Sequence, residues 1–249
     1  MLKKCLALFL LCNAALAADA NNPRWQFDIA PYLWAMNMNG RIASGPVTAH
    51  INQNFSDILR EFDGGGMLFL QAHKGAFGLF GNALYAVLSQ SKDVRTFDAK
   101  LKTRFGLFAG GLSYIIFQEV YKNSRLQLEP YIGARYTMND ARLTIASLAG
   151  SNNQSWTDPL IGMRLNYDIN QNWVTLFAGD IGGKNTSTQY SYDLHAFVGY
   201  KPSSCALRQT SFYLGYRYLY QHYDRGEGLT RFEWNMRLFG PVLGVNFNF

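Results

Sequence analysis

The sequence of 249 residues lacks a hydrophobic run long enough to cross a membrane as a helix, once its first residues are set aside. The richest stretch, residues 106–117, falls well short of the roughly 18 apolar residues that a spanning helix needs, and it contains glycines. The mean hydropathy of -0.12 is also too polar for a bundle of membrane helices. If the chain crosses a membrane, it must therefore do so with strands.

Cysteine is also scarce, with three in the whole chain. Cys5 and Cys12 lie in an N-terminal segment that we expect to be cleaved, which leaves Cys205 alone. A single thiol can form neither an intramolecular disulfide nor a metal site. The triple glycine at residues 64–66 lacks the Lys-Ser/Thr pair that would follow it in a phosphate-binding loop. We therefore predict no cofactor and no bound metal.

The charges do not gather in one run. The chain has 23 lysines and arginines against 17 aspartates and glutamates, a formal net charge of +6. Cleavage of the N-terminal segment would remove Lys3 and Lys4, leaving 21 basic against 17 acidic residues and a net charge of +4. Because these charges are scattered, we predict no nucleic-acid partner. No run rich in proline, serine or charge divides the chain, which favours one domain.

The first positive feature is an export signal. Two lysines precede an apolar stretch at residues 6–11, and Ala15-Leu16-Ala17 supplies the small residues of a cleavage site. We expect residues 1–17 to be a signal peptide used by the Sec pathway. Residues 18–249 would then form a single domain.

Alternation of apolar and polar residues is the main structural signal of the mature chain. Between residues 125 and 139, apolar side chains occupy the even positions, and polar or small ones mostly occupy the odd positions. Similar alternation recurs near residues 156–168, 190–201 and 211–221. Strands that cross a membrane must close into a barrel, because lipid offers no partner for an open sheet edge. The pattern therefore predicts an all-β fold, a closed antiparallel transmembrane β-barrel with a polar lumen.

Connection lengths indicate about ten strands, with eight and twelve as alternatives. Short links alternate with longer polar ones, and an even count brings both termini to the periplasm. The segment near residues 39–66 is predicted to be a long first loop, although residues 47–54 alternate like a strand. The predicted strands lie near residues 25–38, 66–73, 77–88, 99–117, 125–139, 154–168, 172–182, 190–201, 210–223 and 231–249.

The last strand carries a predicted assembly signal and one irregularity. Its outward residues form the pattern that a barrel-assembly machinery would recognise: Leu243, Val245, Phe247 and the terminal aromatic Phe249. Farther upstream, from residue 232 to residue 238, the apolar side chains fall on even positions instead. This change of parity predicts either a bulge near Gly240 or a turn that splits the strand in two.

Several short pieces of the chain carry a family resemblance. They are Pro31-Tyr32-Leu33-Trp34, residues 156–164, Gly179-Asp180-Ile181-Gly182-Gly183, residues 214–219 and Gly240-Pro241-Val242-Leu243-Gly244. In these pieces the chain resembles small, mostly uncharacterised proteobacterial outer-membrane proteins, with an architecture similar to that of OmpA-type and OmpW-type barrels. The resemblance implies a barrel in the outer membrane, but it brings no catalytic or ligand motif.

Charged residues of both signs fall on the predicted lumen face. The candidate lumen-lining residues are Asp28, Arg104, Glu129, Arg135, Asp158, Arg164, Asp180, Asp193, His195 and Arg217. Opposed charges could line a narrow water path, which favours a passive channel for small polar solutes. We therefore predict such a channel. The alternative is that the charges pair and plug the lumen, as in a structural or surface-interaction barrel of adhesin-like type.

We do not expect an enzyme. Ser191, Asp193 and His195 share one strand face, but alternate residues lie roughly 6.6 Å apart, too far for a direct catalytic relay. His222 and Asp224 have no distinctive ligand spacing. An outer-membrane hydrolase is therefore the least favoured hypothesis. The expected partners are outer-membrane lipid, lipopolysaccharide and the assembly machinery, and the sequence leaves the oligomeric state open.

Overall fold

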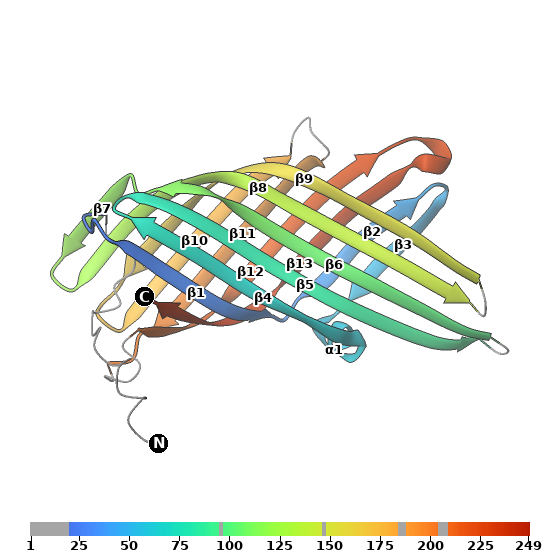
Figure 1. Ribbon diagram of the computed structural model, residues 1–249, viewed down its shortest axis with the longest axis horizontal. Coiled ribbons are helices and arrows are strands. Elements are labelled where there is room, and N and C mark those ends of the chain that lie inside the picture. The colour runs from blue at the N-terminus through green and yellow to red at the C-terminus, as the bar shows by residue number, and fades with distance from the viewer. Residues whose placement is uncertain (1–19, 95–96, 146–147, 184–187, 204–208) are drawn as a thin grey trace, which may run out of the picture.

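Pairing between the first and last strands closes the sheet into a barrel in the computed structural model, which describes residues 20–94, 97–145, 148–183, 188–203 and 209–249 (Figure 1). The predicted signal peptide and Cys205 lie outside these ranges. The described elements are β1 (Trp25–Trp34), β2 (Asn37–Ser44), β3 (Val47–Gln53), α1 (Phe55–Glu61), β4 (Phe62–Lys74), β5 (Phe77–Val94), β6 (Phe97–Tyr114), β7 (Phe117–Tyr121), β8 (Ser124–Ile145), β9 (Leu148–Asp168), β10 (Trp173–Gly183), β11 (Thr188–Tyr200), β12 (Thr210–Arg225), the 3-10 turn η2 (Gly228–Thr230) and β13 (Phe232–Asn248).

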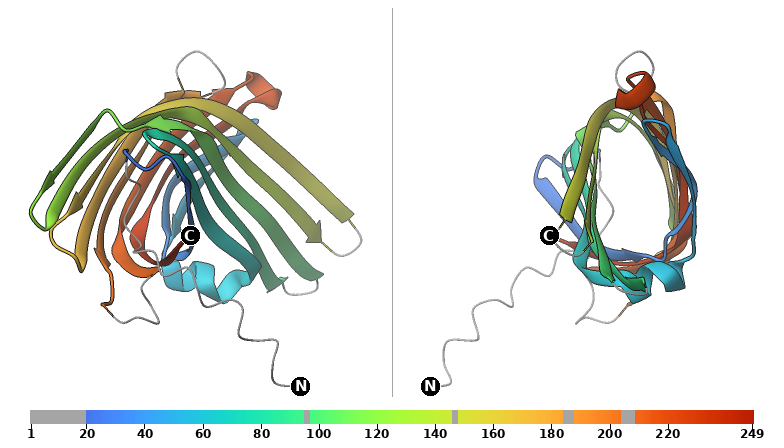
Figure 2. Two further views of the ribbon diagram at one scale, coloured as in Figure 1. Left: turned by 60° about the vertical axis from the view of Figure 1, so that its left-hand side comes forward. Right: turned by 90° about the vertical axis from the view of Figure 1, so that its right-hand side faces the viewer.

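Ten antiparallel strands form the wall, as predicted, so the alternatives of eight and twelve strands are wrong. β1 and β2 act as one wall strand, because both pair with β13 in a single register that runs through Trp34↔Val242 and Asn37↔Phe239. The ring then continues through β4, β5, β6 and β8 to β13. Two further strands are not counted among the ten: β3 pairs with β2, and β7 pairs with β8. The closed ring is visible in the right-hand view of Figure 2.

The two ends of the barrel differ in their connections. At one end, which we call the near end, Phe27 and Phe249 exchange backbone hydrogen bonds of 3.0 and 2.8 Å, so the start of β1 meets the end of the chain. At the opposite end, the far end, lie the connections from β2 to β3, β5 to β6, β8 to β9 and β12 to β13 (Figure 1). We refer to the adjoining parts of the barrel as the near half and the far half.

The segment at residues 39–66, predicted to be a long first loop, is shorter as a connection, because β2 and the start of β4 belong to the wall and β3 and α1 lie between them. β2 pairs with β13, and β3 covers the segment whose alternation suggested a strand. Asn54 caps α1: its Oδ1 accepts a hydrogen bond from the Asp57 backbone at 3.1 Å, and the Asp57 carboxylate accepts one from the Asn54 backbone at 3.3 Å. The buried residue Ile58 anchors the helix to the interior of the far half.

β13 is one continuous strand. Its register with β12 passes without interruption from Phe239↔Tyr218 through Gly240 to Pro241↔Tyr216. Neither the predicted bulge nor the predicted turn therefore occurs. The even-numbered residues of β13 point into the barrel along its whole length.

The change of parity has another cause, a reversal of polarity between the two halves. In the near half, Asn246 points inward and Leu243 outward, where it is 58% exposed. In the far half, Trp234 points inward and is buried, whereas Arg237 points outward and is exposed. The polarity of β12 reverses at the same level, because its apolar residue Leu219 points inward and is fully buried. The far half thus has the polarity of a sheet in water, and the near half that of a sheet in lipid.

The near half is apolar outside. Large apolar side chains are exposed on most of its wall strands, among them Ile29, Leu112, Ile132, Ile161, Ile181, Leu214, Leu243 and Phe247. A soluble protein rarely exposes a continuous apolar surface of this kind. Among the described residues, no helix has the length and apolar character needed to cross a membrane.

Candidate functional site

A group of charged side chains centred on Asp193 of β11 lies inside the near half. Arg217, from the neighbouring strand β12, donates to Asp193 from Nη2 at 2.6 Å and from Nε at 3.1 Å. Arg135 crosses the lumen from β8 and donates both to Asp180 on β10 and, at 3.3 Å, to Asp193. His195 Nε2 lies 3.0 Å from Asp193 Oδ1. Every arginine and aspartate of this group therefore has a partner of opposite charge.

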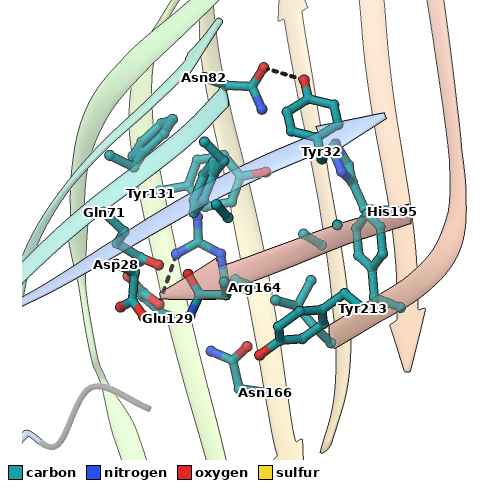
Figure 3. A pocket seen from close by; sticks show the side chains of 18 of the residues that line it. Asp28, Tyr32, Gln71, Asn82, Glu129, Tyr131, Arg164, Asn166, His195 and Tyr213 are labelled. Carbon is teal, nitrogen blue, oxygen red and sulfur yellow. Dashed lines mark hydrogen bonds and ion pairs between the residues drawn. The ribbon is translucent and has the colours of Figure 1, made fainter. Parts of the chain in front are cut away.

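A second group surrounds Glu129 of β8. Arg164, on β9, donates from Nη1 to Glu129 Oε2 at 3.0 Å, a pair that Figure 3 shows inside the barrel. His73 Nε2 and Gln71 Nε2, both from β4, lie 2.9 and 3.2 Å from Glu129 Oε1. The Arg164 guanidinium also lies 5.4 Å from the centre of the Tyr131 ring. We call Glu129, Arg135, Arg164, Asp180, Asp193 and Arg217 the charged layer.

Burial makes the pairing in the charged layer necessary. The side chains of Arg135, Asp193 and Arg217 are only 1%, 2% and 4% exposed. Taking charges out of water is costly, and removing one partner of a buried pair destabilises a protein by about 3–5 kcal/mol. Because the layer is paired within itself, its charges hold the strands together across the lumen.

A cavity of about 230 Å³ borders the charged layer and reaches toward the near end. At its mouth, Asp28 Oδ1 accepts hydrogen bonds from the amides of Asn246 and Asn248 at 2.7 and 3.1 Å. Deeper inside, the Tyr32 hydroxyl donates to Asn82 Oδ1 at 3.0 Å (Figure 3). The chamber therefore combines amide, hydroxyl and paired charged groups.

An apolar cluster closes the lumen on the far side of the charged layer. Arg217 marks the boundary, because its guanidinium lies 4.5 Å from the centre of the Trp34 ring. Beyond it, Trp156 stacks on Tyr223 at 4.6 Å and lies 5.8 Å from Trp234. We call this cluster the far-half core; it comprises Trp34, Met36, Met38, Ile58, Leu84, Phe105, Leu107, Trp156, Leu219, Tyr223, Phe232, Trp234, Met236, Leu238 and Val242. These side chains are almost completely buried, so the interior is packed like the core of a soluble domain.

The predicted lumen residues mostly lie together. The cavity is bordered by Asp28, Glu129, Arg135, Arg164, Asp180, Asp193, His195 and Arg217. Asp158 is fully buried and lies directly opposite Arg135 in the register of β8 and β9.

The prediction for Arg104 is wrong. Its side chain is exposed on the outer surface of β6, opposite Asp140 of β8 in the register. The inward positions at this level belong to the buried residues Phe105 and Leu107. Arg104 lies in the far half, where polarity is reversed, so the rule that placed polar residues inside fails there.

Other functional candidates did not emerge from the sequence. Tyr32, His73 and Tyr213 border the cavity, and Trp34 is the member of the far-half core that contacts Arg217. For His73 a weak signal existed, because it shares one face of β4 with Gln71. Alternation alone does not predict the far-half core, because the apolar face of the strands turns inward there.

The three residues weighed as a catalytic set are only partly connected. His195 contacts Asp193, but that carboxylate also binds Arg217 and Arg135. Ser191 Oγ instead accepts a hydrogen bond from Arg135 Nη1 at 3.4 Å. Among the described residues no hydrogen bond joins Ser191 to His195, and no group of three possible metal ligands occurs.

Comparisons with known proteins found no matching family model and no matching curated protein. Among solved structures, Ail of Yersinia pestis bound to the heparin analogue sucrose octasulfate is 11% identical, covers 90% of this chain and 98% of its own, and has a TM-score of 0.38. Neisserial surface protein A is 15% identical, with coverages of 90% and 97% and a TM-score of 0.31. A Pseudomonas aeruginosa FadL homologue is 9% identical, with 92% of each chain covered and a TM-score of 0.33. No functional inference follows from likeness at this level.

The chain's own architecture identifies its class. Each wall strand of the near half pairs with a neighbour on both sides, the exterior there is apolar, and the lumen is polar. These are the features that a lipid bilayer requires of strands. The described part of the chain therefore has the architecture of a membrane-spanning β-barrel.

Proposed function

We propose that this protein is a closed outer-membrane barrel that acts through the part it displays outside the cell, as a structural or surface-interaction barrel. The observation that supports this most directly is the reversal of polarity along β12 and β13. A far half with an apolar core and a polar surface suits water, so we assign it to the external side. The near end, with the chain terminus, then faces the periplasm.

Strand length favours the same assignment. β8 and β9 contain 22 and 21 residues, whereas a strand needs only about 9–11 to cross a bilayer. The additional residues extend the sheet beyond the lipid and form a folded head. On its surface, Arg231 donates to Asp224 at 3.1 Å and to Glu233 at 2.7 Å. The hydrogen bond to Asp224 first, then the negative charges of Asp224 and Glu233, raise the pKa of Arg231.

Closure of the lumen favours an external role over free diffusion of solutes. The charged layer is paired within itself, and the far-half core fills the interior beyond it. A solute would have to break ion pairs and displace buried aromatic side chains to pass. We therefore favour the plugged alternative over an open channel.

Conductance tests the closed lumen. The refolded protein is inserted into planar bilayers and compared with Trp34→Ala, which removes the aromatic side chain at the boundary of the far-half core. We expect no conductance steps from the wild type and transient openings from the variant. Regular steps from the wild type contradict the proposal.

A second experiment tests the external role. In cells that display the protein, residues 141–152 at the tip of the β8–β9 hairpin are replaced by a two-residue turn. We expect weaker attachment to immobilised matrix proteins and glycans, with unchanged envelope integrity. If attachment does not change, the head is not a binding surface.

The narrow passive channel for small polar solutes remains the second candidate, and one observation favours it. The cavity of about 230 Å³ already offers polar groups to a solute that enters from the near end. A channel then requires the far-half core to open. Swelling of proteoliposomes in solutions of small sugars and amino acids tests this, and the absence of swelling excludes it.

A further inference from the structure

An apolar groove crosses the outer surface of β9, β10, β11 and β12. It is an open depression of about 450 Å³, and outward residues such as Met163, Phe177 and Leu194 form its sides. Its floor lies below these side chains because Gly179 has no side chain and Ala196 has only a methyl group. These two outward positions lie on adjacent strands, between the larger side chains. A groove of this form on a lipid-facing wall suits an acyl chain.

A row of tyrosines continues from the groove toward the far end. Tyr218 borders the groove and stacks on Tyr192, with ring centres 5.9 Å apart and planes at 9°. Tyr192 in turn packs on Tyr220 at 5.3 Å, and the hydroxyls of Tyr220 and Tyr190 lie 3.4 Å apart. Rings with polar tips favour the boundary between acyl chains and water. The row therefore marks the level at which this side of the barrel leaves the hydrocarbon.

Arg237 lies beside this row, on the neighbouring strand β13. It is directly opposite Tyr220 in the register of β12 and β13, and it is exposed on the outer surface. The next outward residue toward the near end, Phe239, packs on Tyr218 at 6.2 Å. Arg237 thus places a positive charge beside the tyrosines, one outward position beyond Phe239 toward the far end.

Arg237 differs from the other arginines on this side of the head. Arg41 contacts Glu233 at 2.6 Å, and Arg231 contacts both Asp224 and Glu233. No carboxylate within ion-pairing distance of Arg237 occurs among the described residues. Its guanidinium is therefore available to an external anion.

We propose that the groove, the tyrosine row and Arg237 form one binding site for a phosphorylated acyl lipid of the outer leaflet. One acyl chain occupies the groove, the tyrosines lie at the level of the headgroup, and Arg237 binds a phosphate. Guanidinium groups suit this ligand because they bind phosphate through two parallel hydrogen bonds. A free phosphate ion is not the intended ligand, because it makes no use of the groove.

Native mass spectrometry of the full-length mature protein in detergent tests the site. The probes are diphosphorylated lipid A and the same lipid without its phosphates. Arg237→Gln should weaken binding of the phosphorylated lipid by about tenfold or more, because one charge-assisted contact is lost, and should leave the other lipid unaffected. Arg104→Gln is the matched control, an exposed outer-surface arginine on the distant strand β6, and should change neither.

A second variant tests the groove. Ala196→Phe fills it and should weaken binding of both lipids, whether phosphorylated or not. Heat-modifiable migration of each variant on gels verifies that the barrel is folded. Equal binding by the wild type, Arg237→Gln and Ala196→Phe would overturn the proposal and leave only a general aromatic belt. The result does not depend on whether the lumen conducts, so this proposal and the closed-lumen proposal can fail separately.

Discussion

Substitution of Asp193 by asparagine tests the charged layer most sharply, because it removes one negative charge without changing the shape of the side chain. Arg217 then loses its ion pair and one of its two contacts of 2.6 and 3.1 Å, because asparagine keeps a single, neutral acceptor oxygen. Its other contacts are the Tyr32 hydroxyl at 3.4 Å and the face of Trp34 at 4.5 Å. Breaking a buried pair from one side costs about 3–5 kcal/mol, and we expect Asp193→Asn to lower the free energy of unfolding by that amount.

The double variant Asp193→Leu, Arg217→Met separates loss of charge balance from loss of packing. It leaves neither member of the pair uncompensated, and apolar replacements of buried pairs are often neutral. Arg135 retains Asp180 in this variant. We therefore expect the double variant to recover more than about 2 kcal/mol of the loss seen in Asp193→Asn.

Urea unfolding from phospholipid vesicles, followed by the fluorescence of the five tryptophans, measures these differences. Asp28→Asn is the control, because Asp28 lies at the mouth of the cavity and binds only the amides of Asn246 and Asn248 in the contacts described. It should cost about 1 kcal/mol. If Asp193→Asn costs no more than this control, the charged layer does not stabilise the barrel as argued.

Three further predictions concern packing and surface. Trp34→Ala should destabilise the barrel by about 3–5 kcal/mol in the same assay, because it empties a buried site in the far-half core. Gly240→Ala should cost more than about 2 kcal/mol, because a Cβ there would clash with the Ala35 carbonyl oxygen, whereas Gly81→Ala has open space and should cost less than about 1 kcal/mol. Arg104→Gln should change stability by less than about 0.5 kcal/mol, in contrast to any arginine of the charged layer. A large loss at Arg104, or equal losses at Gly240 and Gly81, contradicts the described geometry.

Alternation in the sequence predicts much of the wall, because in the near half it reflects a real contrast between lipid and lumen. The segment from residue 125 to residue 139 is an example: its odd positions, including Glu129 and Arg135, do face the lumen. The count of ten strands follows from the same contrast and from the lengths of the connections. What alternation does not encode is which pairs meet across the lumen, since Arg135 and Asp193 are 58 residues apart in the chain.

The apolar interior of the far half cannot be predicted from alternation, for one physical reason. Alternation shows that two faces of a strand differ, but it does not show which solvent each face meets. On β13 the apolar side chains change from the outer to the inner face while the backbone register continues, and in the sequence this looks like a bulge at Gly240. The same reversal explains the error at Arg104. Detecting it would have required the matching change on β12, and hence the register between the strands.

The accessibility of outward-facing side chains tests the reversal of polarity most directly. Single cysteines for spin labels are placed at Leu243 and at Asn235, both outward positions of β13, in a Cys205→Ser background. In proteoliposomes, we predict that the label at residue 243 collides mainly with oxygen dissolved in lipid. The label at residue 235 should collide mainly with a water-soluble nickel complex. If both labels show the same preference for oxygen, the far half lies within the membrane and the account is wrong.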